Sequence, residues 1–100
     1  MKSGFELLWS AQALKDLQNT IEYLSEAWTV REVQNFAKRL DARLNLIRLN
    51  PELFPVTAER KSVRRSVLSN HTVVYYKKSG RVVTVVALFD ARQNPTRLKI

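Results

Sequence analysis

Three short runs of strand-forming residues near the carboxyl end limit what this chain can fold into. Residues 63–68, 72–78 and 81–89 are rich in Val, Tyr, Thr and Phe, and short polar turns at 69–71 and 79–80 separate them. β-Branched and aromatic residues favour strands, and connections this short join strands that run antiparallel. The sequence therefore predicts an antiparallel meander in the last third of the fold.

A short strand and a helix are predicted at the start of the chain. Residues 5–9 are apolar and end at Ser10, a favourable helix N-cap, so they predict a first strand that joins the meander. Apolar residues then recur at three- and four-residue steps, the spacing of one helix face. In the first helix these positions are Leu14, Leu17, Ile21, Leu24 and Trp28. The acids between them, Asp16, Glu22 and Glu26, are expected to form a solvated face.

The second helix carries its own start and stop signals. Thr29 followed by Glu32 fits the capping box, in which a hydroxyl at the N-cap stands three residues before a Glu. Asn50 and Pro51 end the helix, because proline cannot continue it and disfavours helix in the residue before it. The apolar positions between these signals are Val33, Phe36, Ala37, Leu40, Leu44 and Ile47.

These segments predict a single α+β domain over residues 1–100. The order is β–α–α–β–β–β, with an antiparallel sheet packed under a long helical hairpin that turns at residues 28–29. Residues 51–62 contain two prolines and no regular period, so they are predicted to form a loop. Leu53 and Phe54 of that loop are expected to pack against the helices.

The positive charge of the chain lies in its second part. Residues 1–59 contain seven Lys or Arg and eight Asp or Glu, a net charge of −1, whereas residues 60–100 contain ten Lys or Arg and only Asp90, a net charge of +9. A charge of this density predicts a polyanionic partner, either nucleic acid or an acidic protein. The alternative is a basic surface that only keeps the protein in solution.

Several classes of function have no support in the composition. The chain has no cysteine and one histidine, so no disulfide, thiolate chemistry or metal site is expected. Gly4 and Gly80 are its only glycines and cannot form a phosphate-binding loop. No apolar run approaches the ~20 residues that span a bilayer, and no leader is recognised. We therefore expect a cytoplasmic protein without membrane contact, metal or cofactor.

Cations and hydroxyls of the basic part remain as candidates for a functional site. They are Lys61, Arg64, Arg65, His71, Tyr75, Tyr76 and Arg92. Anion or partner binding is assigned to Lys61, Arg64, Arg65, Tyr75 and Arg92. RNA cleavage through the 2′-hydroxyl needs a base, an acid and positive charge on the transition state. Arginines supply this charge readily but the base and the acid poorly, because their pKa stays far above neutrality. The catalytic candidates are Arg65, Arg92 and His71.

The sequence does not decide which of these side chains lie on the face of the sheet that the helices leave uncovered. Arg64 and Arg65 are neighbours on a strand and point to opposite faces, so only one of them can reach the face that the helices leave uncovered. Tyr75 and Tyr76 divide in the same way, one into the core and one free to stack on a base or a partner. His71 lies in a predicted turn, where an exposed structural histidine is the alternative to a catalytic one.

A series of short segments along the chain forms an ordered set. They are Trp9-Ser10, Ala13-Leu14-x-x-Leu17, Ile21-x-Tyr23-Leu24, Leu49-Asn50-Pro51, Val63-Arg64-Arg65, Val74-Tyr75-Tyr76 and Leu88-Phe89-Asp90-Ala91-Arg92-Gln93-Asn94-Pro95. In this order they resemble the RelE/ParE toxin superfamily of bacterial toxin–antitoxin modules, and the resemblance covers nearly the whole chain.

The resemblance implies the same β–α–α–β–β–β fold and two kinds of target. RelE-like members cut messenger RNA in the ribosomal A site, and ParE-like members poison DNA gyrase. Arg65 occupies the place of a basic residue of the nuclease branch, and Arg92 the place of its arginine after the last strand. Three other positions of that branch do not match. Thr72 stands where it has a basic residue, and Leu98 lies near the place of its tyrosine in the tail. The tail histidine of some nuclease relatives is also absent. The long helical hairpin resembles the ParE-like branch more.

We therefore predict the toxin of a type II toxin–antitoxin pair, which inhibits growth by a non-enzymatic action on gyrase and forms a hetero-oligomer with an acidic antitoxin. One alternative is a ribosome-dependent mRNA endonuclease in which Arg65 and Arg92 bind the scissile phosphate. A further alternative is a non-catalytic nucleic-acid-binding module.

The sequence also leads to an expectation about Arg92. Arg65 and Arg92 are expected to converge on one anion through bidentate contacts, so that Arg92→Lys abolishes toxicity with little change in melting temperature. The opposing interpretation is that Arg92 forms an exposed pair with Asp90 that only pins the tail, with a contribution of ~0–1 kcal/mol.

Overall fold

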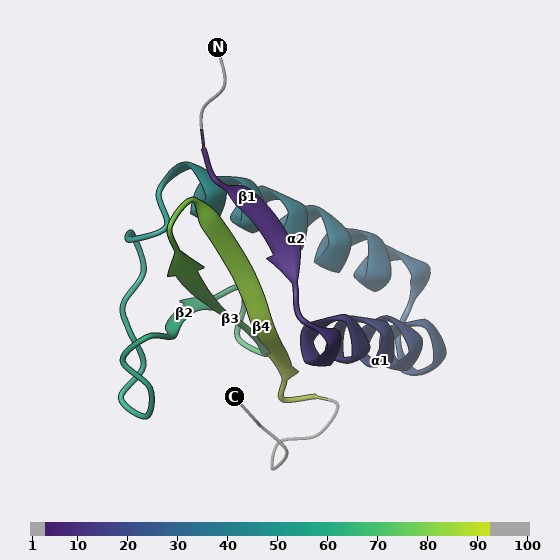
Figure 1. Ribbon diagram of the computed structural model, residues 1–100. Coiled ribbons are helices and arrows are strands. Elements are labelled where there is room, and N and C mark those ends of the chain that lie inside the picture. Colours follow the sequence, from purple (N-terminus) through teal and green to yellow (C-terminus); the bar gives the residue numbers. More distant parts are fainter. Residues whose placement is uncertain (1–3, 93–100) are drawn as a thin grey trace.

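The computed structural model describes residues 4–92, which form a four-stranded sheet with two helices packed on one face (Figure 1). The elements in chain order are β1 (Glu6–Trp9), α1 (Ala11–Ala27), α2 (Val30–Leu49), β2 (Arg64–Val67), β3 (Thr72–Ser79) and β4 (Val82–Asp90). The predicted order and the α+β class are confirmed.

The sheet is mixed, which corrects the prediction of an antiparallel sheet. Its strand order is β1-β4-β3-β2, and the meander β2–β3–β4 is antiparallel as predicted. β1, however, runs parallel to β4, with Leu7 opposite Val83 and Trp9 opposite Val85. The prediction was wrong because a helical hairpin, not a tight turn, follows β1, and only a tight turn forces neighbouring strands to run antiparallel.

Both helices begin at the predicted N-caps. The Ser10 hydroxyl accepts a hydrogen bond from the Ala13 amide at 3.0 Å, and the Thr29 hydroxyl accepts one from the Glu32 amide at 3.2 Å. Each bond satisfies an amide that has no partner within its own helix. Trp28 and Thr29 are the only residues between the helices, so the hairpin turns where the sequence predicts.

The main core lies between the hairpin and the helix-facing side of the sheet. Its buried α2 residues are Phe36, Leu40, Leu44 and Ile47, all of them predicted, and its buried sheet residues are Val74, Tyr76, Val83, Val85 and Leu88. Of the α2 positions in the predicted stripe, Ala37 is exposed.

The buried face of α1 differs from the prediction. Leu14, Ile21 and Trp28 are 52%, 38% and 44% exposed, whereas the buried residues of α1 are Ala13, Thr20 and Leu24. Small side chains at Ala13 and Thr20 let the helix backbone approach the sheet closely. Of the predicted stripe, Leu24 lies in the main core and Leu17 packs against it, as predicted, whereas Leu14, Ile21 and Trp28 are exposed.

Asp16 is part of the fold, which corrects its assignment to a solvated face. β1 ends opposite Val85, but β4 continues to Asp90, so part of its edge lacks a strand partner. Asp16 accepts a hydrogen bond from the Leu88 amide at 3.0 Å, and the Ser10 hydroxyl donates one to the Val86 carbonyl at 3.2 Å. The first turns of α1 thus take the place of a strand along this edge.

Replacing Asp16 with alanine is expected to lower the free energy of unfolding by about 1–3 kcal/mol, because the Leu88 amide would lose its acceptor. Glu22→Ala removes the same charge from an exposed position of the same helix and is expected to stay within about 0.5 kcal/mol. Chemical denaturation of both variants measures the difference. Equal stabilities would contradict the role given to Asp16.

The loop between α2 and β2 covers the far edge of the sheet. Phe54 packs against the core as expected, but Leu53 is 50% exposed, which corrects the expectation for that residue. The Tyr76 hydroxyl donates a hydrogen bond to the Pro51 carbonyl at 2.6 Å, and the Arg65 amide donates one to the Pro55 carbonyl at 2.9 Å. Burial raises the pKa of Tyr76, which therefore stays a neutral hydrogen-bond donor.

Candidate functional site

Strand register places Arg65, and not Arg64, on the face that the helices leave uncovered. Arg64 lies opposite Tyr76, a core residue of the helix-facing side, and its guanidinium donates a hydrogen bond to the Phe54 carbonyl at 2.6 Å. Arg65 lies opposite Tyr75 and is exposed. Residues directly opposite each other on paired strands share one face. Arg64 therefore fixes the loop, and Arg65 is the arginine of this pair that is free for a partner.

Tyr75 is buried on the uncovered face. With Val63 and Ala87 it forms a second, smaller apolar cluster, and these residues are 6%, 3% and 1% exposed. Tyr76 is fully buried in the main core. Neither ring is free to stack on a base, so the expectation that one of them is free was wrong. A role for Tyr75 in partner binding stays a prediction, to which this burial gives no support.

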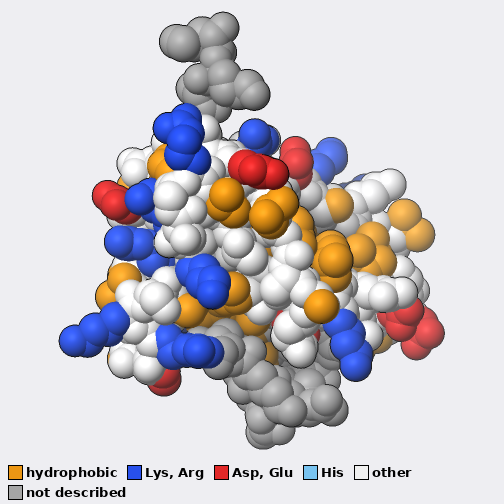
Figure 2. Space-filling model, viewed as in Figure 1, with side chains coloured by type: hydrophobic (Ala, Val, Ile, Leu, Met, Phe, Trp, Pro, Cys, Tyr) orange, Lys and Arg blue, Asp and Glu red, His pale blue; other side chains and the backbone are white. Residues whose placement is uncertain are grey.

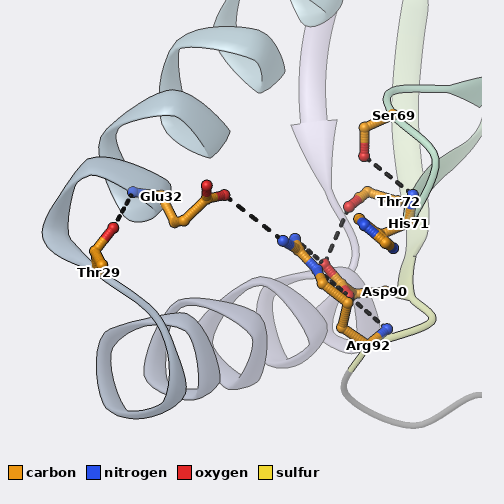
Figure 3. A network of polar contacts seen from close by, with 7 residues as sticks. All are labelled: Thr29, Glu32, Ser69, His71, Thr72, Asp90 and Arg92. Carbon is orange, nitrogen blue, oxygen red and sulfur yellow. Dashed lines mark hydrogen bonds and ion pairs between the residues drawn. The ribbon is translucent and has the colours of Figure 1, made fainter.

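Arg92 is held by Asp90 at the end of β4. Its Nε and Nη2 donate hydrogen bonds to the two carboxylate oxygens at 3.1 and 2.8 Å, and its amide donates a third at 2.9 Å (Figure 3). The Thr72 hydroxyl donates to the same carboxylate at 3.0 Å. The Asp90 side chain is fully buried and that of Arg92 is 12% exposed. The pair is therefore a buried one, which corrects the expectation of an exposed pair.

The other side of Arg92 faces the helical hairpin. Its Nη1 lies 3.8 Å from the Glu32 carboxylate (Figure 3). Its guanidinium carbon lies 5.4 Å from the centre of the Trp28 ring. Arg92 thus joins the last strand of the sheet to the turn between α1 and α2.

The charges of this network support one another. Burial raises the pKa of the Asp90 carboxyl, but the hydrogen bonds and positive charge of Arg92, with the Thr72 hydroxyl, outweigh it and hold the pKa below its ordinary value. The hydrogen bond to Asp90 raises the pKa of Arg92. Both groups are ionised at neutral pH. Arg92 can therefore supply fixed positive charge, but it cannot exchange a proton.

The structure does not bring Arg65 and Arg92 together. Arg65 lies on the uncovered face of the sheet, whereas Asp90 pairs with Thr72, which shares the helix-facing side with Val74. Arg92 is bound to Asp90 and to the hairpin on that same side. The two arginines cannot hold one anion in this conformation, so the expectation of convergence was wrong.

The remaining candidates lie in loops. Lys61 is exposed in the loop before β2. His71 is exposed in the turn between β2 and β3, where its amide donates to the Ser69 hydroxyl at 3.2 Å and its carbonyl accepts from the Ala91 amide at 2.8 Å. His71 and Arg92 line the same pocket. Figure 3 shows both side chains beside Thr72 and Asp90.

That pocket also contains two residues that the sequence analysis missed. Asn35 and Arg39 line it from α2, on the same side of the helix as Glu32. Spacings of three and four residues on one helix place side chains side by side. This polar stripe was visible in the sequence, but without the fold nothing indicated that the turn before β3 and the end of β4 would face it.

Metal and membrane sites can be considered only for the described residues. Within residues 4–92, no group of three or more His, Cys, Asp or Glu side chains is placed to hold a metal ion. Neither helix in this part of the chain has the length and apolarity that crossing a membrane requires.

Comparisons with known structures agree with this fold. The chromosomal ParDE toxin–antitoxin system of P. aeruginosa superposes with a TM-score of 0.70 at 12% identity, covering 86% of this chain and 95% of the other. The E. coli DinJ–YafQ toxin–antitoxin complex has a TM-score of 0.60 at 13% identity, covering 89% and 94%. The YoeB/ParE toxin from Agrobacterium tumefaciens has a TM-score of 0.60 at 13% identity, covering 85% and 96%.

Sequence comparison identifies the family. No curated protein matches the sequence significantly. The family model described as "ParE toxin of type II toxin-antitoxin system, parDE" matches residues 7–95, which is most of the chain. The chain therefore belongs to the ParE toxin family of type II toxin–antitoxin systems.

Proposed function

We propose that this toxin inhibits growth by a non-enzymatic action on DNA gyrase and that an acidic antitoxin neutralises it. The observation that carries the choice of mechanism is the separation of Arg65 and Arg92 onto opposite sides of the sheet. A nuclease needs several cations on one phosphate, because negative charge builds up there in the transition state. The match to the ParE family model supports the same choice.

The surface charge supports an acidic protein as the partner. Lys and Arg side chains gather on the side of the molecule that carries β2 and the loop before it, and only a few Asp and Glu side chains lie among them (Figure 2). This positive charge would make the association with an acidic antitoxin faster and more selective. The solved complexes of similar fold, including DinJ–YafQ, pair such a toxin with an antitoxin.

A ribosome-dependent mRNA endonuclease is the second candidate. The observation in its favour is that His71 and Arg92 line one pocket, so a group that can transfer a proton lies near a fixed positive charge. Against this interpretation, the Nε and Nη2 of Arg92 already donate hydrogen bonds to Asp90 and are not available to a phosphate.

Two assays on the purified protein separate these mechanisms. With gyrase and supercoiled plasmid, the toxin is expected to increase the amount of DNA that is cleaved and bound to the enzyme, while translation in a cell-free extract continues. Cuts at codons held in the ribosomal A site, with supercoiling unaffected, would instead establish the nuclease. Binding to DNA or RNA without either effect would indicate a plain nucleic-acid-binding module.

A further inference from the structure

The pocket that contains His71 and Arg92 has the features of a built binding site. Its volume is about 320 Å³, and its walls come from three parts of the chain that are distant in sequence. Asn35 and Arg39 belong to α2, His71 to the turn before β3, and Arg92 to the end of β4. Such a recess is large enough to hold the end of a side chain from another molecule.

The pocket is rich in hydrogen-bond donors that are not in use. Among residues 4–92, the side chains of Asn35, Arg39, Asn70 and His71 have no hydrogen bond or ion pair. The Nη1 group of Arg92 makes no hydrogen bond to a described residue either, because Glu32 lies 3.8 Å away. Arginine offers only donors, and the amides and the imidazole add further ones. A guest that accepts hydrogen bonds fits this lining.

The charges limit the guest to a single negative charge. Asp90 balances Arg92, and Glu32 and Arg39 line the same pocket from α2 with opposite charges, so the charges of these four side chains cancel. A phosphate monoester, which carries about −1.5 to −2 at neutral pH, would be repelled by Glu32 more strongly than a carboxylate with a single charge. A phosphodiester continues into sugar on both sides, whereas a carboxylate ends a side chain and can enter a recess.

We infer that this pocket binds one aspartate or glutamate side chain of the antitoxin, with the Arg39 guanidinium as its main partner and His71 and Arg92 Nη1 as further donors. The inference rests on the proposed neutralisation by an acidic antitoxin and names the contact through which part of it acts. A carboxylate held by a guanidinium receives two parallel hydrogen bonds, which gives the contact direction as well as charge.

The test compares Arg39→Ala with Arg31→Ala. Both substitutions remove one arginine from α2, and Arg31 is exposed and does not line the pocket. The dissociation constant for the antitoxin, measured with purified proteins, is expected to rise about tenfold or more for Arg39→Ala. For Arg31→Ala a rise of less than about fivefold is expected. Replacing the antitoxin acids one at a time with their amides should reveal one whose effect disappears in the Arg39→Ala background.

Two results would overturn the inference, and a third would refute the proposed function on which it rests. Equal dissociation constants for Arg39→Ala and Arg31→Ala would overturn it. Normal antitoxin binding by Arg39→Ala together with loss of toxicity would also overturn it and would assign the pocket to contact with the cellular target. A wild-type protein that leaves cells unharmed would refute the proposed function, while the purified proteins would still show whether the pocket binds the antitoxin.

Discussion

Replacing Arg92 with methionine is expected to lower the free energy of unfolding by about 3–5 kcal/mol, because a buried carboxylate would lose its charged partner. The Asp90 side chain is fully buried, and Arg92 contributes two hydrogen bonds to it through its side chain. Methionine keeps much of the apolar stem of arginine, so the change isolates the charge and its donors. Denaturant titration at neutral pH gives the value.

Two controls show whether the buried charge is the cause. In the double variant Asp90→Ala/Arg92→Met no buried charge remains, and most of the lost stability is expected to return. The penalty of Arg92→Met alone is also expected to shrink as the pH falls from 7 to 4. In the variant, burial raises the pKa of Asp90, so a proton can neutralise it.

The wild-type protein should show the opposite dependence on pH. The native pKa of Asp90 is lower than its ordinary value, so the unfolded chain takes up the proton first as the pH falls. The stability from this pair is complete above pH ~4 and is lost as the pH falls through the native pKa. If Arg92→Met causes no loss of stability at neutral pH, the Asp90–Arg92 pair does not stabilise the fold as proposed here.

The buried pair also changes the expectation for Arg92→Lys. Lysine keeps the charge but cannot donate from two nitrogens to the two oxygens of Asp90. A fall in melting temperature is therefore expected, where the sequence alone indicated almost none. A loss of toxicity in this variant would identify a functional contact only if it exceeds what the fall in stability explains.

Replacing Leu24 with alanine is expected to cost about 2–5 kcal/mol of unfolding free energy, because it leaves a cavity where α1 packs on the sheet. Leu24 is fully buried in the main core. Thermal and denaturant unfolding measure the loss.

Leu14→Ala is the matched control for Leu24→Ala. The sequence places both leucines on one apolar stripe, but Leu14 is 52% exposed in the structure. Its truncation is expected to cost less than about 1 kcal/mol. Similar losses for the two variants would restore the sequence-based orientation of α1 and contradict the one observed.

The comparison of these leucines shows how far the sequence reaches. Periodicity established that residues 11–27 form a helix, and the hydroxyl at Ser10 marked its start. The rotation of that helix, which lies against β4, depends on the small buried residues Ala13 and Thr20. Alanine and threonine contribute little to a hydrophobic pattern. A pattern of large apolar residues therefore does not reveal a helix face whose small residues allow close packing.

The candidate site illustrates a second limit. The sequence singled out Arg65, His71 and Arg92 by residue type, but their relation depends on strand register and on the direction of the chain after β4. The sequence indicated Asp90 only as an exposed partner of Arg92, and Thr72 only as a place without the expected cation, yet the three form one buried hydrogen-bonded network. Contacts between residues 18 positions apart leave no periodic trace in a sequence.

The parallel pairing of β1 with β4 has a consequence for folding during synthesis. The Ser10 hydroxyl and the Val86 carbonyl that it contacts are separated by 76 residues, so the first strand cannot find its partner until β4 has been made. Contacts of such long range are slow to form, because the entropy of closing a long loop is lost before the contact returns any energy. On the ribosome, the helical hairpin would be available long before the sheet that it covers. The sheet of the toxin is therefore completed only after β4 has left the ribosome.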